Sequence, residues 1–179
     1  MKAEIEFVTL PYSSAAGNSM VDVLIREFAN GKWSHFKSAV AFAKQSGNVE
    51  ELLQSMEGFL AAGNYVEMTF GADKFSGNSR GSELEAVETL LDRFGAQEGF
   101  KLYLYHEKSR AFHPKIYLFS NVAEKTGLFI LGSSNWGFGG LVDNIEANVI
   151  VKLDLQDAEH QTFYDNVNKH FVEFWQEAI

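Results

Sequence analysis

The chain has 179 residues, which is enough to bury a hydrophobic core and is typical of one domain. The absence of cysteine excludes disulfides and thiolate metal sites, and no apolar run is long enough to span a membrane. The formal net charge of −9 argues against a protein that coats nucleic acid generally, because phosphate binding normally needs positive surface. Glu4 and Glu6 interrupt the stretch where a signal peptide would need apolar residues. We therefore expect one cytoplasmic domain over residues 1–179.

Four amphipathic segments predict helices, because apolar residues recur every three to four positions between typical helix ends. The first spans about residues 19–28. The second has Asn48 as N-cap and stops at Gly63, and the third is capped by Ser82 and stops at Gly95. The fourth closes the chain. The apolar stripes expected in the core are Met20, Leu24 and Phe28; Leu52, Met56, Phe59 and Leu60; Leu84, Val87, Leu91 and Phe94; and Phe163, Val167, Phe171, Phe174 and Trp175.

Seven β-rich runs lie between these helices: EIEFV, FKSAVAFA, YVEMTFG, FKLYLY, KIYLF, GLFILG and EANVIVKL. Strands and helices alternate in the first half, which favours parallel crossovers, whereas the later cluster of strands favours hairpins. We expect an α/β fold with a mixed, mostly parallel sheet and helices on both faces. The glycine-rich segment 71–82 is either a substrate-facing loop or an ordinary surface loop.

Charge is distributed unevenly along the chain. Between residues 100 and 125 there are five basic and two acidic side chains, so this segment is positive while the remainder is strongly acidic. An anionic ligand would be drawn here first. A solvated charged hairpin explains the same pattern when the segment is considered alone.

The tripeptide His113-Pro114-Lys115 opens the run KIYLF. A residue before proline favours extended backbone, and proline is tolerated at the first positions of a strand. The strand is therefore predicted to begin near His113. Because side chains alternate along a strand, His113 and Lys115 share one face.

Polar residues also end the next strand and begin the one after it. Ser133 and Asn135 share a face if the extended backbone persists, and Glu146 starts EANVIVKL. An imidazole, an ammonium, a hydroxyl, a carboxamide and a carboxylate would then meet at neighbouring strand ends. A neutral histidine can attack phosphorus, while lysine and asparagine can hold the non-bridging oxygens. The set therefore favours phosphodiester chemistry that needs no metal or other cofactor.

Each of these residues has an ordinary structural interpretation when it is considered alone. His113 is then a satisfied strand histidine, Lys115 a surface lysine and Glu146 a solvent-facing strand residue. Ser133 and Asn135 are then turn formers. Only the joint spacing raises the catalytic interpretation above these.

The set resembles the phospholipase D superfamily, whose signature is HxKxxxxD followed by GSxN and a downstream glutamate. The residues that carry the resemblance are His113 and Lys115, then Gly132, Ser133 and Asn135, then Glu146. The pattern looks most like the single-motif branch of small nucleases and restriction endonucleases. One position departs from it, because Ser120 stands where the family has aspartate.

The resemblance implies a two-step, metal-independent cleavage through a phosphohistidine. Since the set occurs once, it implies a homodimer in which His113 of one subunit attacks and His113 of the other protonates the leaving oxygen. Lys115, Ser133 and Asn135 would bind the phosphate, and Glu146 would orient His113. Trp136 or Phe138, in the rim after the motif, would stack on a base or, as we favour, pack.

The substrate implied is DNA. The resemblance also implies a component of a restriction or defence system, with a fused or separate DNA-recognition domain. The alternatives are a phospholipase-D-like module that binds nucleic acid or dimerises with little or no catalysis, and a lipid phosphodiesterase. Ser120 keeps the first alternative open. A lipid phosphodiesterase would need an apolar helix or loop to reach its substrate in the membrane, and the sequence shows no such segment. No membrane partner is expected.

Overall fold

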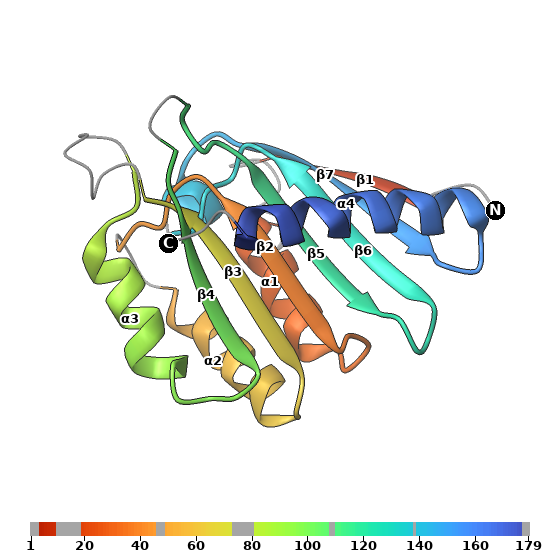
Figure 1. Cartoon of the computed structure of the whole chain (residues 1–179), viewed down its shortest axis with the longest axis horizontal. Coiled ribbons are helices and arrows are strands. Elements are labelled where there is room, and N and C mark those ends of the chain that lie inside the picture. Colours follow the sequence, from red (N-terminus) through yellow and green to blue (C-terminus); the bar gives the residue numbers. More distant parts are fainter. Residues whose placement is uncertain are drawn as a thin grey trace.

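The computed structural model describes residues 4–9, 19–45, 49–72, 81–107, 110–137 and 139–176, to which all structural statements refer. The strands are β1 (Glu4–Thr9), β2 (His35–Val40), β3 (Tyr65–Gly71), β4 (Phe100–Tyr105), β5 (Lys115–Asn121), β6 (Thr126–Gly132) and β7 (Ala147–Asp154) (Figure 1). The helices are α1 (Met20–Ala29), α2 (Glu50–Ala61), α3 (Leu84–Phe94) and α4 (Ala158–Gln176), with a π-helical turn η3 (Gly139–Asp143) before β7. None of the described helices has the length and hydropathy needed to cross a bilayer.

The seven strands form one sheet in the order β1-β7-β6-β5-β2-β3-β4. The crossovers through α2 and α3 make β2, β3 and β4 parallel, as the alternation of elements predicts. The later strands join as antiparallel hairpins, and β1 adds antiparallel to β7 at the far edge. The mixed sheet with helices on both faces is confirmed. Its described pairs are mostly antiparallel rather than mostly parallel, because β5 also meets β2 antiparallel.

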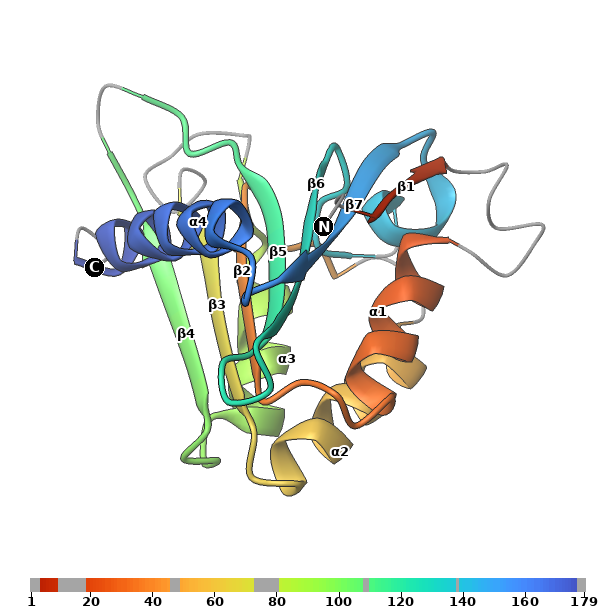
Figure 2. The same cartoon turned by 90° about the vertical axis from the view of Figure 1, so that its right-hand side faces the viewer.

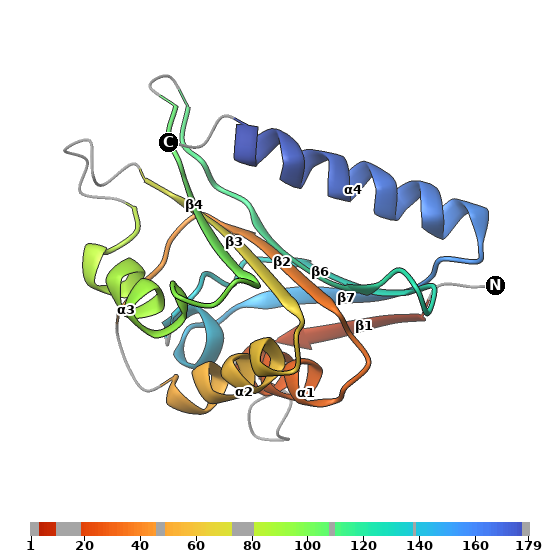
Figure 3. The ribbon, with the colours of Figure 1, turned by 60° about the horizontal axis from the view of Figure 1, so that its bottom comes forward.

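Helices α1, α2 and α3 cover one face of the sheet and α4 crosses the other, so that the sheet separates two cores (Figures 2 and 3). In the larger core, the rings of Phe28, Phe36 and Phe119 pack with centroids 4.6 to 5.0 Å apart. In the smaller core, Phe171 of α4 is buried with Leu118 of β5. The chain thus buries apolar groups on both sides of the central strands, which holds their ends in fixed positions.

The helix termini agree in part with the sequence signals. Ser19 caps α1 as expected, through a reciprocal pair of hydrogen bonds with Asp22. Asn48, the expected cap of α2, lies outside the described residues. Ser82 does not cap α3; it is buried, and its Oγ accepts a hydrogen bond from the backbone N–H of Ala43 at 3.0 Å, while Glu83 occupies the N-cap position.

The buried face of α3 also differs from the expected stripe. Leu84 and Leu91 are exposed, whereas Ala86 and Leu90 are buried with the expected Val87 and Phe94. The buried face is therefore turned about the helix axis from the expected one, because contact with the rest of the larger core decides which apolar residues of the helix are buried.

Four neighbouring strands, β2, β5, β6 and β7, begin or end at the same end of the sheet. Val40 at the end of β2 pairs with Lys115 at the start of β5. Gly132 at the end of β6 pairs with Asn148 at the start of β7. This register brings the HPK segment, the GSSN segment and Glu146 to neighbouring strand ends.

Candidate active site

The strand β5 begins at Lys115 rather than at His113, with Pro114 just before it. The carbonyl oxygen of Pro114 accepts a hydrogen bond from Ala41 N at 2.8 Å, which ties the segment to the end of β2. His113 is exposed, while Lys115 is only 7% exposed. The Nζ of Lys115 lies 3.2 Å from Nδ1 and 3.4 Å from Nε2 of His113, and donates to the His113 carbonyl at 3.3 Å. The largely buried ammonium of Lys115 thus lies against the exposed imidazole of His113.

The surroundings of Lys115 act on its charge in opposite directions. Burial lowers the pKa of Lys115, and the carboxylate of Glu146 partly offsets this by raising it. The same carboxylate acts on Tyr117, whose pKa is raised above its ordinary value chiefly by complete burial. Glu146 therefore lies close enough to the start of β5 to influence both groups electrostatically.

Glu146 itself stands immediately before β7. Its Oε1 accepts a hydrogen bond from Asn144 Nδ2 at 3.3 Å, and no hydrogen bond joins it to His113 within the described structure. The structure therefore gathers His113, Lys115 and Glu146 with the lysine as the shared neighbour.

Ser133 and Asn135 follow β6 but do not continue it, because the strand ends at Gly132. The Oγ of Ser133 accepts a hydrogen bond from Ala147 N at 3.0 Å, which joins the end of β6 to the start of β7. The Oδ1 of Asn135 is buried and has no hydrogen-bond partner among the described residues. A buried carbonyl oxygen without a hydrogen bond is energetically costly.

Three polar residues of the site were not anticipated from the sequence. Tyr117 donates its hydroxyl hydrogen to the carbonyl oxygen of Ser134 at 2.8 Å, and Asn148 Nδ2 donates to Ser134 Oγ at 2.9 Å. These buried bonds attach the segment after β6 to β5 and β7. Strand alternation could have found two of the three, because Tyr117 lies two residues after Lys115 and Asn148 two residues after Glu146.

An aromatic ring also borders the site. The ring of Phe42 meets the ring of His113 edge to face, with centroids 5.6 Å apart and planes at 77°. Lys115 Nζ lies 5.8 Å from the centroid of the same ring. Phe42 follows β2, so the parallel half of the sheet contributes to the site as well.

Other expected features fall away from the site or outside the described residues. Trp136 is buried and packs with Phe70, consistent with the packing interpretation. Phe138 and residues 73–80 lie outside the described residues.

Ser120, at the position of the family aspartate, is buried on the α4 side of β5, where its Oγ accepts from the Tyr164 hydroxyl at 3.4 Å. Five residues of strand, roughly 17 Å, separate it from Lys115.

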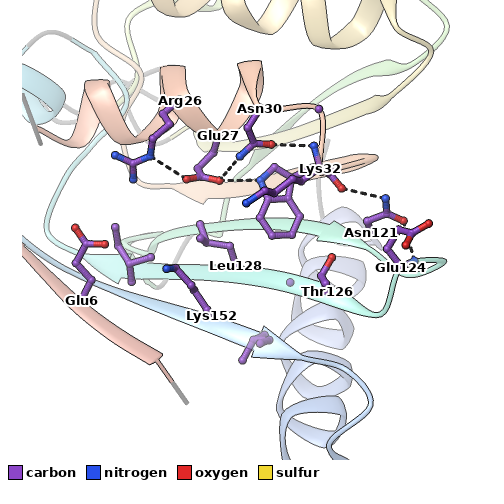
Figure 4. A pocket seen from close by; sticks show the side chains of 15 residues that line it. Glu6, Arg26, Glu27, Asn30, Lys32, Asn121, Glu124, Thr126, Leu128 and Lys152 are labelled. Atoms are coloured by element: carbon purple, nitrogen blue, oxygen red, sulfur yellow. Dashed lines mark hydrogen bonds and ion pairs between the residues drawn. The ribbon is translucent and has the colours of Figure 1, made fainter. Parts of the chain in front are cut away.

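A cavity of about 870 Å³ lies elsewhere, at the opposite ends of β5 and β6 (Figure 4). Its charged side chains are three basic and three acidic groups: Arg26, Lys32, Lys152, Glu6, Glu27 and Glu124. Glu27 is satisfied by Arg26, Asn30 and Trp33. Because these charges balance and no histidine lines the cavity, it offers no equivalent of the His113 chemistry.

Several solved structures share this fold. NucT from Helicobacter pylori matches with a TM-score of 0.67 and 13% identity, over 99% of both chains. The phospholipase D family member Nuc from Salmonella typhimurium matches with a TM-score of 0.63 and 14% identity, over 99% of this chain and 97% of that chain. Phosphatidylserine synthase from Haemophilus influenzae matches with a TM-score of 0.69 and 12% identity, over 99% of this chain but only 39% of the synthase chain. No curated protein sequence matches the chain.

The family comparison is more specific than these folds. The model described as "Cardiolipin synthase, PLD-like domain" matches residues 21–175, which is most of the chain and contains every residue of the candidate site. The chain therefore belongs to this family of phospholipase-D-like domains and, with it, to the phospholipase D superfamily of phosphodiesterases.

Proposed function

We propose that the chain is a metal-independent endonuclease that cleaves DNA through a covalent phosphohistidine at His113. The observation that carries this proposal is the Lys115 ammonium, which lies within 3.4 Å of both ring nitrogens of an exposed histidine. A phosphate placed beside His113 would contact this cation directly. The charge that develops on the phosphoryl oxygens would then be stabilised by a donor that is already in position.

In the first step, a ring nitrogen of neutral His113 attacks phosphorus. The nitrogen–phosphorus bond forms as the bond from phosphorus to the leaving oxygen breaks, and a second imidazole gives its proton to that oxygen. In the second step, this imidazole takes a proton from water, and the resulting hydroxide displaces His113 from phosphorus. Proton and charge balance over the two steps, and the enzyme returns to its starting form.

The second imidazole comes from a second copy of the chain. Of the other described histidines, His35 lies against Tyr65 at the far end of β2, His160 and His170 belong to α4, and His106 follows the end of β4. We assign the acid to the His113 of the second copy because the set of motif residues occurs once in the chain. Two copies related by a two-fold axis would place two His113 side chains on one phosphate. Ser133 and Asn135 would add donors to the phosphate oxygens, and Glu146 would orient His113 and maintain the charge of Lys115.

DNA is the proposed substrate because the segment 100–125 is locally positive within an acidic chain. Two of the matching structures are named NucT and Nuc, and these names refer to those proteins. The total acidity suggests that sequence preference is supplied by a fused or separate recognition domain, as in a restriction system.

The test compares His113→Ala with His170→Ala, a control that removes an exposed histidine from α4. We expect His113→Ala to abolish cleavage of plasmid and single-stranded DNA at low salt, and His170→Ala to leave it intact. Labelled phosphate should be trapped on the wild type and not on His113→Ala. Activity that is lost in EDTA and restored by a divalent ion would contradict the metal-independent mechanism.

The substrate is tested in the same assays. RNA, a simple phosphodiester and phosphatidyl lipid vesicles are offered beside DNA. Cleavage of the lipid alone would overturn the choice of substrate and establish a lipid phosphodiesterase. Binding of DNA without cleavage of any substrate would establish the non-catalytic module instead.

A further inference from the structure

The segment that follows β2, residues 41–45, lies between the two halves of the motif. Ala41 N donates to the carbonyl of Pro114 at 2.8 Å, on the HPK side. On the GSSN side, the carbonyl of Phe42 accepts from Trp136 N at 3.2 Å, and Lys44 N donates to the carbonyl of Trp136 at 2.9 Å. These bonds fix the segment relative to His113 and Asn135.

Side chains alternate along this segment. Ala41 and Ala43 are fully buried, whereas Phe42 and Lys44 are partly exposed. Lys44 Nζ lies 5.8 Å from the centroid of the Phe42 ring, and Lys115 Nζ lies at the same distance from that centroid. The two ammonium groups are therefore separated by no more than about twice this distance, and both lie near the same aromatic ring.

Lys44 is held by a carboxylate that is itself anchored. Its Nζ lies 3.3 Å from Oε1 of Glu83, and Oε2 of Glu83 accepts from Gln45 N at 2.9 Å. About a third of each side chain of the pair is exposed. The ammonium is thus accessible, held in one place, and electrically balanced when no anion is bound.

We propose that Lys44 binds the phosphate adjacent to the one at His113, so that the site recognises a polynucleotide rather than an isolated phosphodiester. This inference rests on the proposed function and extends it to a second subsite. Phe42 lies near both cations and would present its ring beside the linking nucleoside, so that a base or sugar can pack on it. The scissile phosphate meets Lys115, and its neighbour along the strand meets Lys44.

Glu83 provides a way to distinguish a phosphate-binding Lys44 from a purely structural one. In the absence of substrate its carboxylate neutralises Lys44, and in the complex it lies near a bound phosphate and opposes it. Removing the carboxylate charge should therefore strengthen binding of polynucleotide, whereas removing the ammonium should weaken it. A lysine with a merely structural role would show loss in both variants.

The experiment measures binding of a fluorescent single-stranded oligonucleotide by anisotropy across a salt series, for Lys44→Ala and Glu83→Gln. We expect Lys44→Ala to weaken binding about tenfold and to reduce the slope of log K against log salt by about 0.7, the value for one phosphate contact on a single strand. We expect Glu83→Gln to tighten binding severalfold. The matched control is the Lys152–Glu4 pair at the far end of β7, where Lys152→Ala and Glu4→Gln should change neither quantity.

The kinetic arm compares cleavage of the oligonucleotide with hydrolysis of bis(p-nitrophenyl) phosphate, which has one phosphorus. Lys44→Ala should reduce kcat/KM for the oligonucleotide at least fivefold more than for the small ester. An unchanged salt slope in Lys44→Ala, weaker binding in Glu83→Gln, or no oligonucleotide binding by the wild type would overturn the subsite. If nothing is cleaved but the salt slopes change as stated, the nuclease proposal fails and the subsite stands.

Discussion

Lys115 shows how one residue joins the fold to the chemistry. Its ammonium is withdrawn from solvent, which lowers its pKa, and the charge of Glu146 raises the pKa again. Because the side chain is largely buried, its ammonium is less hydrated than that of a surface lysine. Such a cation interacts more strongly with a phosphate oxygen than a fully hydrated one.

The opposing influences of burial and of Glu146 on the pKa of Lys115 can be tested by changing that one carboxylate. Glu146→Gln removes the raising influence and leaves the desolvation, so the pKa of Lys115 should fall further below the ordinary lysine value of 10.5. Because a lower pKa means that the proton is lost at lower pH, the alkaline limb of the cleavage profile should move to lower pH. The titration of Lys115 Nζ, followed by NMR, measures the same shift without requiring activity.

Glu124→Gln is the control for this titration, because Glu124 lines the cavity at the other end of the sheet. It should leave the titration of Lys115 unchanged. A pKa of Lys115 that stays fixed or rises in Glu146→Gln would show that the Glu146 carboxylate does not stabilise this cation.

At the scale of elements, one hydrogen bond attaches the segment after β6 to β5. The Tyr117 hydroxyl is completely buried, and its only described hydrogen bond goes to the carbonyl of Ser134. Tyr117→Phe keeps the ring and removes the donor, which leaves that carbonyl without it. We expect the free energy of unfolding to fall by about 1–3 kcal/mol, the usual result of leaving a buried polar group unsatisfied.

Urea denaturation measures this loss as a lower midpoint with an unchanged m-value. Tyr65→Phe is the matched control, because Tyr65 is largely exposed and stacks on His35 at the other end of the strands. It should change the midpoint little. Equal stability of Tyr117→Phe and the wild type would show that this bond does not hold the segment.

The elements themselves were largely predictable from local signals. Helix α1 begins where Ser19 and Asp22 form the capping box, and the β-rich runs become strands within one or two residues, except that β2 ends three residues before its predicted run does. The face of α3 was not predictable, because the choice between Leu91 and Leu90 depends on contact with the sheet. The course of the chain after Gly132 was also missed, since a buried Ser134 between two polar neighbours has no periodic signal.

At the scale of the whole molecule, the order of strands depends on contacts that no local pattern encodes. The sequence predicts helices on both faces and hairpins in the second half, but not that β5 lies antiparallel beside β2. That single pairing places Lys115 beside Val40 and so brings Phe42 and Lys44 to the motif. The candidate residues could be named from their spacing, whereas their neighbours required the sheet.

The two-fold arrangement gives a prediction that only an assembly can fulfil. If each phosphate needs two His113 side chains, a mixed dimer of wild type and His113→Ala lacks either the nucleophile or the acid. Subunits exchanged at equal amounts should then retain about a quarter of the activity of wild type at the same total concentration, because only wild-type pairs are complete. Independent subunits would retain about half.

The measurement mixes the two chains over a range of ratios, allows exchange, and records the cleavage rate at each ratio. A quadratic dependence on the wild-type fraction supports the shared site. Mixing with His170→Ala provides the control, since that variant keeps His113 and should give the full rate at every ratio. Sedimentation of the wild type sets the concentration at which dimers form. A strictly monomeric chain that cleaves DNA, or a linear dependence on the wild-type fraction, would mean that one His113 suffices and that another group protonates the leaving oxygen.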